Sequence, residues 1–286
     1  MNLTVVFTLT SPLVHGAFGA DIGNAVAIRR EPVVSLVGAP RIPCLSGNAL
    51  RGAMRRIVMR DMFDRLNLSR DTMEPVAWDR LYGALANGGH LDGSESTVKP
   101  ATVRELREAI PPLSVFGAAL YSSMLAGKIQ VGMSWPVCVE TIEAGLVEAS
   151  RTVLDGLYAE DLVSETSTVR HIDREIQDPE VTGITPMPVT VEALSTGSRL
   201  CCVITGDCTP TEEAIVVYAL RRITVIGGKR GAGFGRVRVD VIGSTASPDA
   251  WEATLSRDAE KLRAALLDLG ARVTPGAKAK RAKAGA

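Results

Sequence analysis

Aromatic residues are scarce in this sequence: phenylalanine, tyrosine and tryptophan together make up 4% of its 286 residues. Single-stranded nucleic acid is often bound by stacking its bases on aromatic rings, so the composition argues against an extensive stacking surface. The formal net charge is zero. Taken as a whole, a neutral chain lacks the positive charge that binds phosphate, so any nucleic-acid site must be concentrated locally.

Cysteines are few and show no pairing pattern. There are five, an odd number, and no two of them form a C-x-x-C motif. We therefore expect no disulfide framework, and a reducing compartment. The three histidines do not stand at zinc-ligand spacing from any cysteine, so the sequence predicts no metal and no other cofactor.

Long apolar runs and the motifs of common enzymes are absent as well. No stretch of eighteen apolar residues occurs, and the N-terminus has no basic segment followed by an apolar one. The sequence thus predicts a cytoplasmic protein with no membrane partner. It contains neither G-x-S-x-G nor H-E-x-x-H, and we predict that it is not an enzyme.

Positive charge is concentrated in three segments. Seven basic residues and two acidic ones lie between Arg41 and Arg70, and six basic residues with no acidic one lie between Arg221 and Arg238. Four more basic residues lie between Pro275 and Ala286, so the remainder of the chain is acidic. Such a chain can bind phosphate on one face and stay soluble elsewhere. The simpler alternative is that the basic residues of each segment are ordinary solvent-exposed surface residues with no ligand.

Strands and helices mix without strict alternation, which favours an α+β fold over a doubly wound sheet. Alternating apolar positions predict strands, and capped amphipathic patterns predict helices. The expected strands cover 3–9, 25–37, 128–139, 189–191, 199–205 and 236–241, and the expected helices begin at Ser46, Leu113, Thr209 and Ser247. Residues 14–24 read as a loop, 67–107 as a polar segment with loops at 87–89 and 92–94, 164–188 as irregular, and the tail after Val273 as disordered.

The first motif with chemical meaning is Gly227-Gly228-Lys229-Arg230-Gly231-Ala232-Gly233-Phe234-Gly235. Glycine lets N–H groups face outward and another backbone come close, and the two central cations suit phosphate. The segment is neither a Walker loop nor a dinucleotide fingerprint, because no Ser or Thr follows the lysine and a strand comes next. A tight helix-to-strand connection that needs positive φ is the simpler alternative.

The second motif runs from Ile42 to Gly52 and sets a small polar loop before a helix. Ser46 is the expected N-cap, and the N-terminus of a helix attracts anions. Arg51 and Arg55 lie one turn apart on that helix. Together with the glycine-rich segment, this makes two independent devices for holding phosphate. A capped helix with a solvated arginine face is the alternative.

These motifs resemble those of one protein superfamily. Gly227 to Gly235 is similar to the glycine-rich loop of the RAMP superfamily of CRISPR-associated proteins, and Ile42 to Gly52 resembles the I-P-G-S-S-L-R-G element of its backbone, or Cas-seven-like, branch. Ser114-Val115-Phe116-Gly117 resembles the L-F-G element of that branch. Glu165 to Gly197 resembles its thumb insertion, with Ile172-Asp173-Arg174 ahead of Val191 to Gly197. All four follow the family's order.

The resemblance implies an RRM-like (ferredoxin-type) palm over residues 1–272, with a finger-like insertion at 67–112, a thumb-like insertion at 160–197 and a basic tail at 273–286. It implies copies stacked head to tail along a guide RNA, with other effector subunits, and a target nucleic acid paired with the guide. Such a subunit must accept any guide, so it should hold phosphate and ribose and leave base edges free. Carried over by position, the RNA-binding residues would be Ser46, Asn48, Arg51, Arg55, Gly228, Lys229, Arg230, Gly231 and Gly233, with Arg170, Arg174 and Met187 in the thumb.

Asp21 decides between subtypes. The branch that cleaves target RNA has an aspartate in the loop after the first strand, and Asp21 stands in such a stretch, Gly19 to Asn24. The surrounding residues look closer to the type IV backbone subunit, for which cleavage is not expected. Two enzyme hypotheses stay open. One is a type III-like subunit that cleaves target RNA with metal through Asp21; the other is a small-molecule enzyme whose glycine loop binds a nucleotide phosphate. His15, near Asp21, would suit acid–base cleavage of RNA as in the processing nucleases of the same superfamily, but the helix-borne arginines and the thumb-like segment favour the backbone branch.

Overall fold

A five-stranded antiparallel sheet organises the chain in the computed structural model, which describes residues 1–22, 25–34, 38–89, 99–120, 123–148, 156–169 and 188–272. Its strand order is β13 (Val237–Ile242), β1 (Asn2–Leu9), β12 (Arg199–Gly206) and β8 (Ile129–Val131), and β9 (Trp135–Pro136) also pairs with β12. Every second residue of β1 is buried, and Leu3, Val5 and Phe7 are completely so. One face of this sheet therefore forms the core.

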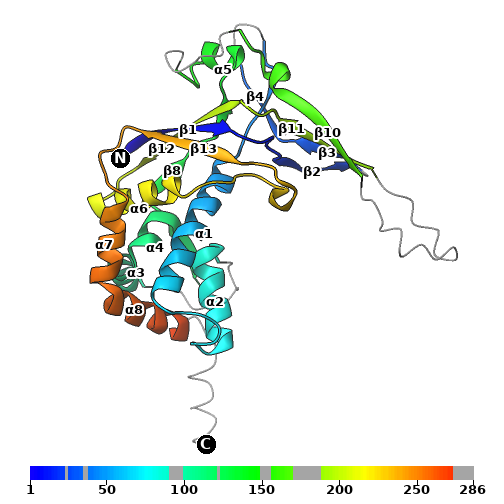
Figure 1. Cartoon of the computed structure of the whole chain (residues 1–286). Helices are drawn as coiled ribbons and strands as arrows, with labels where there is room; N and C mark the ends of the chain where they lie inside the picture. The colour runs from blue at the N-terminus through cyan, green and yellow to red at the C-terminus, as the bar shows by residue number, and fades with distance from the viewer. Residues whose placement is uncertain are drawn as a thin grey trace, which may run out of the picture.

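A second sheet extends away from the first, as Figure 1 shows. Its order is β10 (Val163–Val169), β11 (Pro188–Leu194), β3 (Ala25–Ile28) and β2 (Gly16–Ile22). The Glu192 carboxylate ties it together by accepting from the N–H of Ile28 at 2.9 Å and pairing with Arg30 at 2.7 Å. A short ribbon of β4 (Arg30–Pro32) and β5 (Arg41–Pro43) leads from this sheet to the first long helix.

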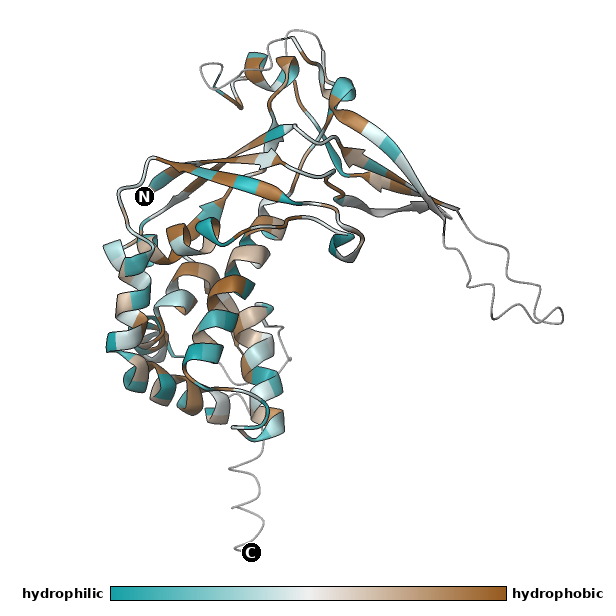
Figure 2. Cartoon of the chain, in the orientation of Figure 1, coloured by the Kyte–Doolittle hydropathy of each residue, from teal (hydrophilic) through white to brown (hydrophobic). Residues whose placement is uncertain are grey.

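Helices cover the inner face of the five-stranded sheet and form a lobe below it (Figure 1). They are α1 (Gly47–Arg65), α2 (Pro75–Ala86), α3 (Pro100–Ala109), α4 (Pro111–Phe116), α6 (Pro210–Arg221), α7 (Asp249–Arg257) and α8 (Ala259–Arg272), while α5 (Val139–Glu143) and the 3-10 turn η2 (Ala159–Leu162) lie elsewhere. Apolar and polar residues alternate around these helices in Figure 2, as expected for helices that bury one side. No helix in the described ranges is both long enough and apolar enough to cross a bilayer.

Helix α1 buries the face that the sequence predicts. Leu50, Met54 and Val58 are fully buried, and Ser46 is the N-cap, its hydroxyl accepting from the N–H of Ala49 at 3.3 Å. The predicted capping box also forms at the start of α6, where Glu212 accepts from the N–H of Thr209 at 2.8 Å. Local sequence signals therefore set where both central helices begin.

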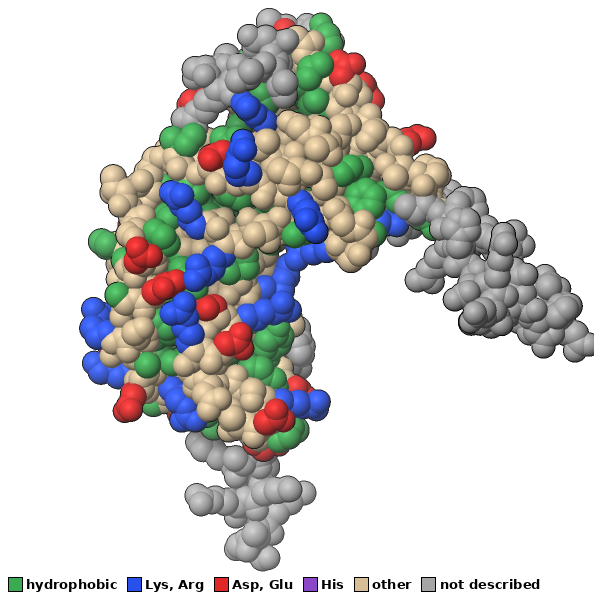
Figure 3. All heavy atoms as spheres, viewed as in Figure 1, with side chains coloured by type: hydrophobic (Ala, Val, Ile, Leu, Met, Phe, Trp, Pro, Cys, Tyr) green, Lys and Arg blue, Asp and Glu red, His purple; other side chains and the backbone are tan. Residues whose placement is uncertain are grey.

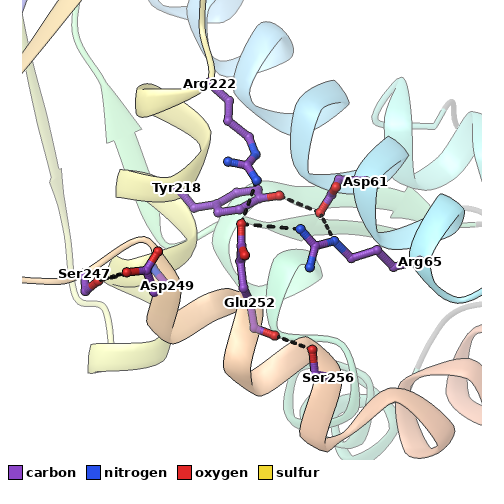
Figure 4. A network of polar contacts seen from close by, with 8 residues as sticks. All are labelled: Asp61, Arg65, Tyr218, Arg222, Ser247, Asp249, Glu252 and Ser256. Atoms are coloured by element: carbon purple, nitrogen blue, oxygen red, sulfur yellow. Dashed lines mark hydrogen bonds and ion pairs between the residues drawn. The ribbon is translucent and has the colours of Figure 1, made fainter.

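A polar network braces α1, α6 and α7 at the side of the lobe (Figure 4). The Tyr218 hydroxyl donates to Asp61 at 2.5 Å, Arg65 bridges Asp61 and Glu252, and Arg222 binds Glu252 at 2.6 Å. The Arg222 guanidinium also lies 4.0 Å from the centre of the Tyr218 ring. Burial and the Asp61 carboxylate raise the pKa of Tyr218 to about 12, so its hydroxyl keeps its proton and donates.

The prediction of an α+β chain is confirmed, but three local predictions are wrong. Residues 14–24, read as a loop, contain strand β2, and residues 164–188, read as irregular, begin within strand β10. The polar segment 67–107 contains helices α2 and α3, which the sequence did not indicate. The helix expected from Leu113 ends at Phe116 and gives way to a hairpin of β6 (Gly117–Leu120) and β7 (Ser123–Ala126). In each place, pairing or packing with distant segments outweighs weak local propensity.

A partly buried ion pair fastens the chain after β7 to the start of α6. The Lys128 ammonium lies 2.9 Å from both carboxylate oxygens of Glu212, whose side chain is 6% exposed. Burial raises the pKa of Glu212, but Lys128, Ser114 and the Thr209 N–H together outweigh burial and lower the pKa below the usual value of 4.5. The pair therefore stabilises the fold above that pH, and its contribution is lost as pH falls through the lowered pKa.

We expect Glu212→Gln to lower the free energy of unfolding at pH 7 by about 1–3 kcal/mol, because it leaves Lys128 without its counter-ion. The difference from the parent should shrink as pH falls from about 4.5, the unfolded-state pKa, through the lowered pKa at which the folded parent's carboxylate is protonated. Urea unfolding at pH 7 and at acid pH measures both quantities. Glu260→Gln, at an exposed position on α8, is the control. A difference between parent and variant that does not change with pH would contradict the assignment.

Candidate nucleic-acid interface

A groove of about 770 Å³ runs beside the N-terminal half of α1. One wall is α1 itself, and the other is formed by the β6–β7 hairpin and β8. Its lining consists of Asn48, Arg51, Gly52, Arg55, Arg56, Asn87, Gly88, Phe116, Ala118, Ala119, Met124, Leu125, Ala126, Gly127, Ile129, Gln130 and Val131. The groove thus has a cationic wall facing a largely apolar one.

Arg51 and Arg55 are held by backbone carbonyl oxygens rather than by carboxylates. Arg51 donates to the Phe116 oxygen at 2.7 Å, and Arg55 donates to the oxygens of Phe116 and Gly117 at 2.5 and 3.1 Å. Within the described part of the chain, the buried Nε atoms of both residues have no hydrogen-bond acceptor. The guanidinium groups are therefore fixed in position with donor capacity left over.

The arginines of this wall carry uncompensated charge. Burial lowers the pKa of Arg51, and burial together with its Arg51 and Arg56 neighbours lowers the pKa of Arg55 to about 10. In the described ranges, none of Arg51, Arg55 and Arg56 has an acidic partner within salt-bridge distance. Half-buried like charges without counter-ions disfavour one another, and an anion bound between them would relieve that repulsion.

The start of α1 is packed so closely that it has little freedom. A side chain at Gly47 would overlap the Val131 carbonyl oxygen, so glycine is required there. The N–H of Ser46 donates to His15 Nε2 at 3.3 Å, and burial followed by the Arg29 charge lowers the pKa of His15. Asn48 is exposed at the mouth of the groove. Ser46 therefore serves the helix as its cap, while Asn48 is free to meet a ligand.

The glycine-rich segment forms an ordered loop between α6 and β13. Its base is clamped on the chain after β1, because Gly228 donates to the Val14 oxygen at 2.7 Å and Gly235 donates to the Pro12 oxygen at 2.8 Å. The 3-10 turn η5 (Arg230–Ala232) forms its tip, with Lys229 in the left-handed region at φ 50°. The interpretation of this segment as a tight helix-to-strand connection is thus correct for the base of the loop, but it does not explain the exposed cations at the tip.

At two positions of the loop, nothing in the described part of the chain requires the residue to be glycine. A Cβ at Gly231 would meet nothing within 4 Å, a Cβ at Gly228 would touch only the Val14 oxygen at 3.7 Å, and neither residue has positive φ. Gly233 does need its positive φ of 87°, although its surroundings are open. Open glycines at a cationic tip leave room for the backbone of a ligand.

The two motifs meet in space through a residue that the sequence analysis did not single out. Arg56 of α1 has its pKa lowered by burial and then by the charges of Arg230 and Arg60. Arg230, at the tip of the glycine loop, is therefore close enough to repel it. Figure 3 shows Lys and Arg side chains gathered in the hollow where the sheets meet the helical lobe. The spacing of Arg51, Arg55 and Arg56 in the sequence was visible, but their common neighbour Arg230 was not.

The other predicted positions are not brought into this groove. Arg170, Arg174 and Met187 lie outside the described residues. Asp21 belongs to strand β2, opposite Val26 of β3, and not to a loop. The hairpin residue Met124 also lines the groove, and sequence reasoning missed it, because its neighbours Ser123 and Leu125 form no pattern that would single it out.

Fold and groove together define an α+β protein with a cationic, partly apolar groove. No protein-family model matches the chain, and no curated protein matches its sequence. Among solved structures, it is similar to a chain of a type IV-B CRISPR complex, with a TM-score of 0.60 and 18% identity over 89% of this chain and 98% of that one. The Csc2 protein of Thermofilum pendens scores 0.41 at 16% identity over 94% and 80%, too low to carry weight. The chain thus shares the fold of a CRISPR-complex protein, which confirms at the level of fold the resemblance that its motifs indicated.

Proposed function

We propose that this chain binds guide RNA independently of sequence, as the repeated backbone subunit of a type IV CRISPR effector complex. The observation that carries the proposal is the unpaired cationic wall of Arg51, Arg55 and Arg56 beside the exposed tip of the glycine loop. Guanidinium groups match phosphate geometry, and phosphate contacts carry no sequence information. The shared fold with a chain of a type IV-B complex supports the same function.

We further infer that the five-stranded sheet with α1 and α6 is an RRM-like core. In chain order its elements run strand, helix, strand, strand, helix, strand, through β1, α1, β8, β12, α6 and β13. The sheet order β13-β1-β12-β8 then matches the ferredoxin-type arrangement, with both helices on one face. In this proposal, residues 67–112 and 160–197 are finger-like and thumb-like insertions, and copies stack head to tail along the RNA.

The RNA-binding residues that we propose come from both motifs. Arg51, Arg55 and Arg56 would hold phosphates along the groove, and Lys229 and Arg230 would hold the next part of the strand. Ser46, whose hydroxyl can donate while it caps α1, and Asn48 would contact the RNA backbone. Gly228, Gly231 and Gly233 would allow its close approach, and Arg170, Arg174 and Met187 remain proposed thumb contacts. We propose no catalytic step. A paired target RNA should therefore stay intact with Mg²⁺, whereas cutting that Asp21→Ala abolishes would refute this part.

The first test uses protein purified from a cell that carries its native locus. We expect a high ratio of absorbance at 260 to 280 nm and a large assembly that RNase treatment breaks down. Chromatography and absorbance together measure this. A monomer free of nucleic acid would contradict the proposal, and stoichiometric binding of a free nucleotide by that monomer would favour a small-molecule enzyme.

The double substitution Lys229→Ala with Arg230→Ala should weaken binding to all single-stranded RNA sequences alike, by roughly ten- to a hundredfold. Both side chains are exposed, and Arg230 Nε donates only within the loop, to the Gly227 oxygen at 3.1 Å, so folding should be little affected. If two phosphate contacts are lost, the slope of log K against log salt should become shallower by about 1.4. The control removes the same charge from α8 with Lys261→Ala and Arg263→Ala. Equal affinity of both double variants at physiological salt would count against the loop.

A further inference from the structure

The outer face of the β6–β7 hairpin is small and apolar except for one large side chain. In this hairpin Ala119 lies opposite Met124, and Gly117 lies opposite Ala126. Ala118 and Leu125 are 4% and 5% exposed and belong to the core, although both also line the groove, and Ala119 is 7% exposed, whereas Met124 is 77% exposed. Met124 and Ala126 thus share the outward face, about 6.6 Å apart along the strand.

This face is held rigidly against the cationic wall. Arg51 and Arg55 donate to the carbonyl oxygens of Phe116 and Gly117 at the foot of the hairpin. On the other side, the N–H of Ala119 donates to the Gly88 oxygen at 2.7 Å, just past the end of α2. The hairpin is therefore positioned before any ligand arrives, with its apolar face next to the arginines.

Met124 differs from the other exposed apolar residues in its surroundings. The large hydrophobic side chains exposed in the described ranges are Val34, Val76, Met124, Leu146, Tyr158, Val203 and Ile242, and of these Met124 alone lines the groove. An isolated exposed apolar side chain needs no explanation, but one that faces a row of unpaired guanidinium groups forms a two-part surface. Such a surface fits a ligand that is anionic on one side and flat and apolar on the other.

We propose that Met124 and Ala126 form a platform for a nucleobase of the bound RNA strand, whose phosphates lie against Arg51, Arg55 and Arg56. The inference rests on the proposed function and adds that the apolar wall of the groove contacts the base of the nucleotide. A thioether packs on the face of any base, so the contact tolerates every sequence. Ala126, the exposed neighbour of Met124 on this face, is small and leaves the platform flat, and no aromatic residue is needed.

The test compares RNA with and without bases. Full-length protein freed of nucleic acid is assembled with a synthetic single-stranded RNA, or with the same ribose-phosphate chain lacking its bases, and is then treated briefly with hydrogen peroxide. Mass spectrometry follows oxidation of each methionine. We expect base-bearing RNA to protect Met124 at least several-fold and the abasic chain to protect it little. Met54, Met59 and Met62 are fully buried and serve as internal references.

The affinities of two single variants for the same two RNAs give a second measurement. Met124→Ala should weaken binding of base-bearing RNA about two- to tenfold and leave binding of the abasic chain unchanged. Val203→Ala, which shortens an exposed side chain away from the groove, should change neither. Equal loss for both RNAs, or equal protection by both, would overturn the platform while leaving phosphate binding by the groove in place. Failure of the parent to bind either RNA would instead overturn the proposed function.

Discussion

Replacing Arg56 with glutamate is expected to lower the affinity for single-stranded RNA by about a hundredfold and to leave the fold intact. A charge-assisted contact to phosphate contributes about 1.5–3 kcal/mol, and every 1.4 kcal/mol is a factor of ten in affinity. Arg56 lies in the groove between the α1 arginines and Arg230, so a glutamate there repels the strand at the point where both motifs meet. Because it has no acidic partner in the described ranges, its removal breaks no ion pair and relieves repulsion among the arginines.

Fluorescence anisotropy with labelled RNA over a range of salt concentrations measures this effect. The slope of log K against log salt should become shallower by about 0.7 for the phosphate contact that is lost. Arg263→Glu reverses the same charge at an exposed position on α8 and is the matched control. Thermal unfolding of the free Arg56→Glu variant should show a midpoint no lower than the parent's. An equal loss of affinity in both variants would mean that general charge, and not the groove, binds the RNA.

Replacing Gly235 with alanine is expected to lower the free energy of unfolding by about 3 kcal/mol. Gly235 has φ 81°, which an L residue with a side chain rarely adopts, and a Cβ there would overlap the Ile226 carbonyl oxygen. The same residue exchanges hydrogen bonds with its surroundings, accepting from Ile226 and donating to Pro12, each at 2.8 Å. The substitution therefore strains the base of the glycine loop where it joins the core sheet.

Gly231→Ala, four residues earlier in the same loop, is the matched control for stability. Its surroundings are open and its φ is not positive, so urea unfolding should give the parent's value within about 0.5 kcal/mol. If the loop backbone contacts RNA, this stable variant should nevertheless bind RNA more weakly. Equal destabilisation by both substitutions would contradict the division of the loop into a structural base and a ligand-facing tip.

Much of the scaffold follows from local sequence signals. The alternation of Leu3 to Leu9 predicted β1, and the small polar loop ending at Ser46 predicted the start of α1. Thr209 and Glu212 predicted the capping box of α6, which the structure confirms. These predictions hold because a cap or an alternating strand depends on residues only a few positions apart. The wrong predictions concern segments whose structure depends on distant partners.

The β6–β7 hairpin illustrates why. Its sequence is rich in alanine and leucine and was expected to continue the helix from Leu113, because both residues favour helix. Instead, the helix stops at Gly117, which takes φ 65°, and the carbonyl oxygens around it accept from Arg51 and Arg55, more than sixty positions earlier. Helix propensity differs by less than about 1 kcal/mol per residue, so such contacts outweigh it.

The sequence by itself determined the α+β class, the two central helices with their caps, and the two basic, glycine-bearing motifs, since each depends on neighbouring residues. Only the tertiary structure decided how the motifs combine. It set Arg230 against Arg56, separated by more than 170 positions, and it faced the α1 arginines with the hairpin that carries Met124. Charge repulsion between distant residues and the exposure of an apolar side chain depend on tertiary packing and produce no local pattern in the sequence. The site could therefore be identified only once the packing of α1 against the β6–β7 hairpin was known.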